Sequence, residues 1–171
     1  MTASSPTSLP RESRAIRTLS LPGLIRLVTE IDDNGPISRH RGSLQGALGD
    51  LPIGQLRHAI DTARDLGLIH ACGHATACYQ LTTSGQDLAE LYDTAARWAR
   101  SRQLPSPTSD FVARVQYALQ LQDGGPVQSC AATEPSAPRA ALSEWLRAHP
   151  RVLHQDVARS SHAAQEPGRA A

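Results

Sequence analysis

Side chains that can bind metals or be oxidised are concentrated at His70, Cys72, His74 and Cys78. Imidazole and thiolate groups suit zinc, and four of them can close a tetrahedron. Their spacing matches no familiar zinc finger, and isolated Cys and His residues in a hairpin usually pack or face solvent. Cys72 and Cys78 would form a disulfide only if their Cα atoms came within about 7 Å. We therefore predict no metal and no cofactor, and keep a metal- or thiol-responsive site as an alternative.

A second set of side chains has the chemistry that reads DNA bases. In a helix predicted over residues 53–66, the outer side carries polar side chains, namely Gln55, Arg57, His58, Asp61 and Thr62. Gln55 could bind adenine and Arg57 could bind guanine, each through two hydrogen bonds, whereas Asp61 could accept from a cytosine amine. Alternatively, Arg57 and Asp61 form an exposed ion pair within the helix. We predict base contacts from Gln55, Arg57, His58 and Asp61.

Basic side chains also gather at Arg39, His40 and Arg41, at the start of a helix predicted over residues 37–48. The amides at a helix N-terminus favour phosphate, and two guanidinium groups would add to that attraction. The alternative interpretation is a solvated helix start. We predict that these three residues contact the DNA backbone.

The sequence carries no recognisable catalytic pattern. It lacks a Gly-rich phosphate loop, a Gly-x-Ser-x-Gly elbow and a His-Glu-x-x-His motif. The carboxylates are scattered singly apart from Asp32 and Asp33, which we expect to cap and end a helix. We predict that the protein is not an enzyme.

Composition limits which residues can form the core and how the chain could bind a charged partner. Hydrophobic residues make up 40% of the 171 residues and aromatics only 4%, so a core must rest on Leu, Ile, Val and Ala. All 17 basic residues are arginine, and the net charge is +1. A DNA-binding protein with this charge balance must concentrate its positive charge locally or bind as a dimer.

Cysteine content and hydropathy predict the compartment. The three cysteines (Cys72, Cys78 and Cys130) are too few for a disulfide scaffold and fit reduced thiols in a reducing cytoplasm. The first residues lack the apolar run of a signal peptide, and no stretch approaches a membrane span in length. We expect a soluble cytoplasmic protein that does not bind membranes.

The elements that must position these residues follow from apolar spacing. A first helix opens at Pro22 and Gly23 and buries Leu24, Leu27, Val28 and Ile31. The helix over residues 37–48 presents Leu44, Ala47 and Leu48 to the core. The helix over residues 53–66 should bury four apolar side chains, namely Ile53, Leu56, Ile60 and Ala63.

A hairpin and two longer helices follow. Gly67 ends the preceding helix, and residues 68–72 and 77–81 alternate as two paired strands. Thr82 or Ser84 should cap a helix over about 85–102, and Ser109 or Asp110 a fifth helix. That fifth helix carries an apolar stripe, namely Phe111, Val115, Ala118 and Leu119. With the first helix and the end of the fourth, it is our candidate contact for a homodimer; the alternative is packing within its own domain.

Composition also divides the chain. Residues 1–20 are rich in Ser, Thr, Pro and Arg and predict a flexible arm, in which Arg11, Arg14 and Arg17 could enter the minor groove or simply remain in solvent. Residues 21–121 form the predicted domain. Residues 122–171 read as a largely disordered tail, with a possible short helix near 142–153.

The order of motifs resembles the HxlR-type branch of the MarR-like winged helix regulators. Gly35-Pro36 leads into Ser38 and Leu44, Gly67-Leu68-Ile69 ends the third helix, and the wing returns through Tyr79, Leu81, Thr82 and Gly85, with Trp98 further on. The likeness covers residues 22–100. No cysteine precedes Cys72, so the N-terminal thiol sensing of some members is not implied, and the wing has no arginine.

The resemblance implies a mainly α fold, a winged helix-turn-helix of three helices and a two-stranded wing with additional C-terminal helices. It also implies a sequence-specific transcriptional regulator that binds double-stranded DNA as a homodimer, with residues 53–66 in the major groove. One alternative is a winged-helix module that binds proteins and not DNA. The other is the metal- or thiol-responsive regulator that uses His70, Cys72, His74 and Cys78.

Overall fold

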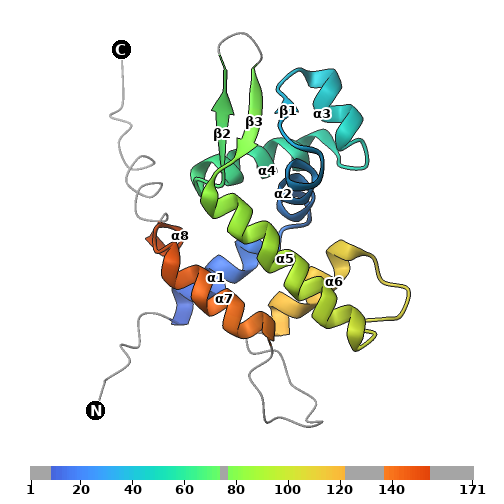
Figure 1. Ribbon diagram of the computed structural model, residues 1–171, viewed down its shortest axis with the longest axis vertical. Coiled ribbons are helices and arrows are strands. Elements are labelled where there is room, and N and C mark those ends of the chain that lie inside the picture. Colours follow the sequence, from blue (N-terminus) through green and yellow to red (C-terminus); the bar gives the residue numbers. More distant parts are fainter. Residues whose placement is uncertain (1–8, 74–76, 122–136, 155–171) are drawn as a thin grey trace, which may run out of the picture.

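The computed structural model describes residues 9–73, 77–121 and 137–154, and confirms a mainly α architecture (Figure 1). The helices are α1 (Leu9–Leu19), α2 (Pro22–Asn34), α3 (Arg41–Ala47), α4 (Ile53–Asp65), α5 (Thr83–Ser101), α6 (Phe111–Gln120), α7 (Ala137–Ala148) and α8 (Arg151–His154). The strands are β1 (Ile37–Ser38), β2 (Ile69–Cys72) and β3 (Cys78–Leu81). None of the helices in the described part of the chain is long and apolar enough to cross a membrane.

The strands form an antiparallel sheet in the order β1-β3-β2. The predicted hairpin is confirmed, with Ile69 opposite Leu81 and Cys72 opposite Cys78. The helix predicted from residue 37 begins only at residue 41, because Ile37 pairs with Tyr79 and makes β1 the third strand. Just beyond Ser38, the Arg39 amide donates to Ala77 O at 2.7 Å, so sheet hydrogen bonds satisfy the backbone where a helical turn was expected.

Helices α2 and α4 pack together beneath the sheet. The predicted core side chains of α2 (Leu24, Leu27, Val28 and Ile31) are all buried. A Cβ atom at Gly23 would lie 3.2 Å from Ala59 Cβ, so α2 and α4 approach closely there. Two predictions for α4 were wrong: Ile53 is 42% exposed, whereas Thr62 is buried. The buried stripe centres on Ala59 and Ala63, which brings Thr62 inward and leaves the first-turn Ile53 beyond the edge of the core.

Helix α5 is locked to the hairpin at its N-terminal end. The predicted cap is confirmed at Thr82, whose Oγ1 accepts from the amide of Gly85 at 3.2 Å and donates to Gly67 O at 2.7 Å. A Cβ atom at Gly85 would overlap the Leu68 carbonyl oxygen, so only glycine permits this approach. The joint therefore fixes the direction of α5 relative to β2 and β3.

The predicted N-terminal arm was wrong over residues 9–19, which form α1. Ala15, Ile16 and Leu19 of this helix are buried in the core. Tyr92 of α5 is fully buried, and its hydroxyl donates to Leu19 O at 2.7 Å. Burial raises the pKa of Tyr92 far above its usual range. An apolar stripe and a long-range hydrogen bond thus dock a segment whose overall composition is polar. Residues 1–8 lie outside the described part.

Helices α6 and α7 pack against α5 from the same chain (Figure 1). Asp110 caps α6 as predicted, accepting from Ala113 N at 2.7 Å. In α6, Val115, Ala118 and Leu119 are completely buried. The stripe proposed as a dimer contact is therefore used for internal packing, apart from the half-buried Phe111.

The predicted tail also contains a core helix. Leu142, Trp145 and Leu146 of α7 are buried, and Trp145 Nε1 donates to Ser84 O at 3.3 Å. The short helix expected near 142–153 is thus part of a longer structured segment, because its apolar side covers α5. The remaining parts of the predicted tail, residues 122–136 and 155–171, lie outside the described residues.

Candidate nucleic-acid interface

The outer side of α4 carries the predicted base-reading residues. Gln55, Arg57, His58 and Asp61 are all exposed. Successive residues of an α-helix turn by about 100°, so Gln55 and Arg57 lie about 160° apart around the axis. Gly54, His58 and Asp61 occupy the middle of the exposed side, with Arg57 on one flank and Gln55 on the other. The structure thus leaves all four side chains accessible but does not bring them together on one line.

Charges of both signs alternate on this side of α4. Arg57 and Arg64 lie on one flank, and Asp61 and Asp65 lie nearer the middle. The ion pair considered between Arg57 and Asp61 is not formed, and neither side chain pairs with any other described residue. The Arg57 guanidinium is therefore available to a partner, while Asp61 would repel a phosphate that came close.

The predicted phosphate contacts near α3 are differently placed. His40 is exposed at the N-cap of α3 and its side chain makes no capping hydrogen bond. The Arg39 guanidinium lies over the Tyr79 ring, 5.4 Å from its centroid, a cation–π geometry that holds it against β3. The side chain of Arg41, the third predicted phosphate contact, lies outside the described part of the structure. His40 is thus free to meet a partner, whereas Arg39 would have to leave Tyr79.

In the hairpin, Cys72 and Cys78 form a disulfide, with their Cα atoms 5.2 Å apart. The expectation of reduced thiols was wrong for this pair, because the strand register places the two residues directly opposite each other within bridging distance. Their sulfurs are then not thiolate ligands, and the described residues hold no group of three or more potential metal ligands. His70 is exposed opposite Gln80, and His74 lies outside the described residues.

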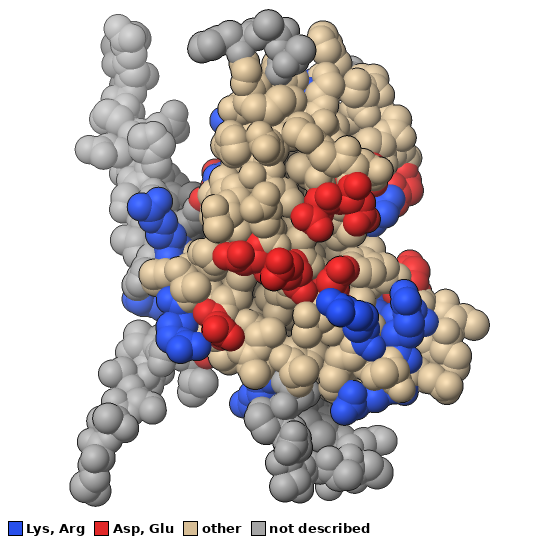
Figure 2. All heavy atoms as spheres, in the orientation of Figure 1, with Lys and Arg blue, Asp and Glu red and all other residues tan. Residues whose placement is uncertain are grey.

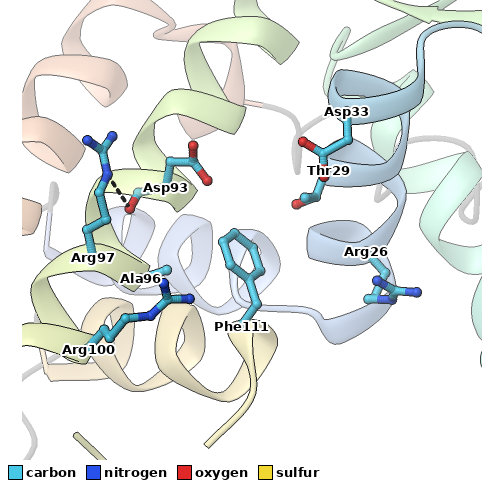
Figure 3. Close-up of a pocket in the computed structure, with 8 residues that line it drawn as sticks. All are labelled: Arg26, Thr29, Asp33, Asp93, Ala96, Arg97, Arg100 and Phe111. Carbon is cyan, nitrogen blue, oxygen red and sulfur yellow. Dashed lines mark hydrogen bonds between the residues drawn. The ribbon is translucent and has the colours of Figure 1, made fainter. Parts of the chain in front are cut away.

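A pocket of about 430 Å³ opens between α2, α5 and the start of α6 (Figure 3). It is lined by residues from all three helices, namely Arg26, Thr29, Asp33, Asp93, Ala96, Arg97, Arg100 and Phe111. No site was predicted here from the sequence, in which Asp33 was expected only to cap and end a helix. The one available signal was the spacing of Asp93, Ala96, Arg97 and Arg100, which places these residues on one side of α5.

Several carboxylates lie close together around the pocket. Burial raises the pKa of Asp32, and the neighbouring carboxylates of Asp33 and Asp93 raise it further. Figure 2 shows acidic side chains across the middle of this side of the molecule, with arginines gathered below them and a largely uncharged surface above. Arg26 is already engaged, because it donates to both carboxylate oxygens of Asp50 at 3.0 and 3.1 Å.

Comparisons of the chain with protein families, curated proteins and solved structures found no match. The resemblance drawn over residues 22–100 therefore depends on the order of its sequence motifs.

Proposed function

We propose that the protein is a sequence-specific DNA-binding regulator with a winged helix-turn-helix, in which α4 enters the major groove. The observation that carries this proposal is the arrangement around α4. Helix α2, strand β1, helices α3 and α4, and the β2–β3 hairpin follow one another, the sheet order is β1-β3-β2, and the outer side of α4 is exposed. A helix held in this way matches how recognition helices are presented to DNA.

The positions around α4 assign different roles to its side chains. The major groove is wide enough for one helix, and the middle of the exposed side would face the base edges. Gly54 lies there in the first turn, where the absence of a side chain permits close approach to the groove floor. His58 and Asp61 would meet bases next, whereas Arg57 and Gln55 would reach the bases or phosphates toward either wall of the groove.

A near-neutral chain needs more than one such contact surface. A single module with few phosphate contacts binds weakly and loses affinity steeply with salt. We propose a homodimer that reads two half-sites, which doubles the contacts. Since α6 is covered within its own chain, the dimer contact has to lie elsewhere than the stripe expected from the sequence.

Selection from a randomised duplex library tests the proposal without knowledge of the natural target. The purified full-length protein is expected to enrich one motif with two related half-sites. Its affinity for that duplex should fall as salt rises, with a slope that reports the number of phosphate contacts. Failure to enrich any motif at low salt would contradict the proposal.

A protein-binding module is the second candidate, and two features of α4 favour it. Ile53 is a large apolar side chain 42% exposed on the first turn, and Asp61 lies toward the middle of the surface that would face DNA. Apolar and mixed-charge groups together suit a protein surface. Loss of partner binding on Ile53→Ser, in a protein that enriches no DNA motif, would establish this candidate in place of the first.

A further inference from the structure

We infer that the pocket between α2, α5 and α6 binds a small amphoteric molecule, with an amine at one end, a carboxylate at the other and an apolar body between. This inference does not depend on DNA binding. It follows from three observations: the pocket is lined by charges of opposite sign, the side chains of Asp33, Asp93 and Arg100 form no ion pair within the described residues, and an aromatic ring lies beside them.

The amine end is defined by Asp33 of α2 and Asp93 of α5. Both lie on the same side of the Phe111 ring (Figure 3). Neither carboxylate forms an ion pair with any residue in the described segments. Asp33 also lies in the last turn of α2, where the carbonyl ends of the helix add negative potential. An ammonium group placed here would meet two carboxylates and the edge of a negative helix end.

Thr29 adds unused hydrogen-bonding capacity to the same wall. It lies one turn before Asp33 on α2 and beside it in Figure 3. Its Oγ1 is buried and has no hydrogen-bond partner among the described residues. Buried hydroxyl groups are normally hydrogen-bonded, so an amine N–H donated to Thr29 would satisfy it.

The carboxylate end is defined by Arg100. This residue follows Asp93 by two turns on the same side of α5, about 10 Å along the helix axis. In Figure 3 its guanidinium lies beside Phe111, farther along α5 than Asp93, and it pairs with no described residue. The other two arginines of the lining are less available: Arg26 is bound to Asp50, and Arg97 Nε donates to Asp93 O at 3.4 Å.

The body of the ligand is defined by the surface between these charges. The Phe111 ring projects between α2 and α5, and Ala96 leaves room beside it on α5 (Figure 3). Half-buried, Phe111 offers a ring face to a flat apolar group. Because the opposite charges are about two helical turns apart, the ligand's charges should lie at opposite ends of its body and not on adjacent atoms.

Three probes of matched shape test this assignment by calorimetry on the full-length protein. They are 4-(aminomethyl)benzoate with both charges, benzylamine with the amine alone, and benzoate with the carboxylate alone. We expect the first to bind most tightly, benzylamine more weakly and benzoate least. Asp93→Asn should weaken the two amines about tenfold, and Arg100→Gln should reduce 4-(aminomethyl)benzoate to the affinity of benzylamine.

Glu90→Gln is the matched control, because Glu90 is exposed on α5 but does not line the pocket. It should leave all three affinities unchanged. If Asp93→Asn fails to fold, which its circular dichroism would show, Asp33→Asn from the facing helix takes its place. The inference would be overturned if none of the probes showed saturable binding, or if benzoate bound most tightly. It would also be overturned if Asp93→Asn and Glu90→Gln bound the two amines with equal affinity. None of these outcomes bears on whether α4 binds DNA.

Discussion

The two ends of α5 lie next to surfaces of different kinds. Its N-terminal end joins the hairpin at Gly67, just after α4, whose exposed side carries both arginines and aspartates. Its C-terminal half lines a hollow in which Asp33 and Asp93 lie near each other and Arg100 lies two turns farther along α5. Alternating charges on an exposed helix suit an extended partner, whereas separated charges in a concave site suit a small one. One helix thus connects a candidate macromolecular surface to a candidate ligand site.

The largest effect is expected where α5 meets the hairpin, at Gly85. Gly85→Ala places a methyl group against the Leu68 carbonyl oxygen, which is backbone and cannot move aside. We expect a loss of about 3 kcal/mol or more in the free energy of unfolding, measured in urea. Gly46→Ala on α3 is the control, since nothing lies within 4 Å of its Cβ position. Similar stabilities for the two variants would show that α5 is not fixed to the hairpin in this way.

Reduction of the Cys72–Cys78 disulfide should affect the hairpin and leave the pocket unchanged. Opening this short loop restores entropy to the unfolded chain and is expected to lower stability by about 2 kcal/mol. Hydrogen exchange should accelerate over β2 and β3 and stay unchanged over the pocket residues of α5. Unchanged exchange in the hairpin after reduction, with free thiols verified by alkylation, would show that the bridge does not order this region.

Gly54→Ala should affect the α4 surface in two opposite ways. Alanine favours the helix, and the Cβ position is open, so the free energy of unfolding should rise by about 0.5 kcal/mol. The same methyl group would stand where α4 approaches DNA most closely, so affinity for the selected duplex should fall. Gly46→Ala should give the first effect without the second. A variant that is more stable and binds DNA equally well would place the contact elsewhere on α4.

The smallest effect is expected at the acidic side of the pocket. The pKa of Asp32 is raised in the folded state, so its charged form costs stability above that pKa, and the cost disappears as the pH falls through it. Asp32→Asn should therefore stabilise the protein at pH 7, by less than about 0.5 kcal/mol, and not at pH 3.

Asp50→Asn is the comparison of opposite sign. Arg26 lowers the pKa of Asp50, so this carboxylate contributes stability above its unfolded pKa that is lost as the pH falls through its folded pKa. The substitution should slightly destabilise the protein at pH 7. The same sign for both substitutions in thermal melts at pH 7 would contradict the charge separation described here.

Local patterns predicted the elements whose signals are contiguous in the chain. The cap at Thr82, the cap at Asp110 and the buried stripe of α2 each depend on residues within a few positions of one another. Helix α1 was missed because its composition is polar, and because what fixes it is distant: Leu19 accepts from Tyr92, which is 73 residues away. A short apolar stripe predicts a helix only when the surface that covers it is known.

The functional surfaces were predicted unevenly for the same reason. Exposure of Gln55, Arg57, His58 and Asp61 followed from helical periodicity, but their separation around α4 shows that exposure alone does not define a common line of contact. The pocket could not be predicted, because Asp33, Asp93 and Phe111 come from three helices. No local spacing brings these residues together; the packing of α2 and α6 against α5 does.

Fluorescence anisotropy on the selected duplex tests whether the exposed side of α4 binds DNA. Wild-type protein is compared with Arg57→Ala and with Arg147→Ala, which removes another exposed arginine, from α7. We predict that Arg57→Ala weakens binding about tenfold and that Arg147→Ala binds like the wild type. Equal affinities for all three proteins would show that DNA does not bind through the exposed side of α4.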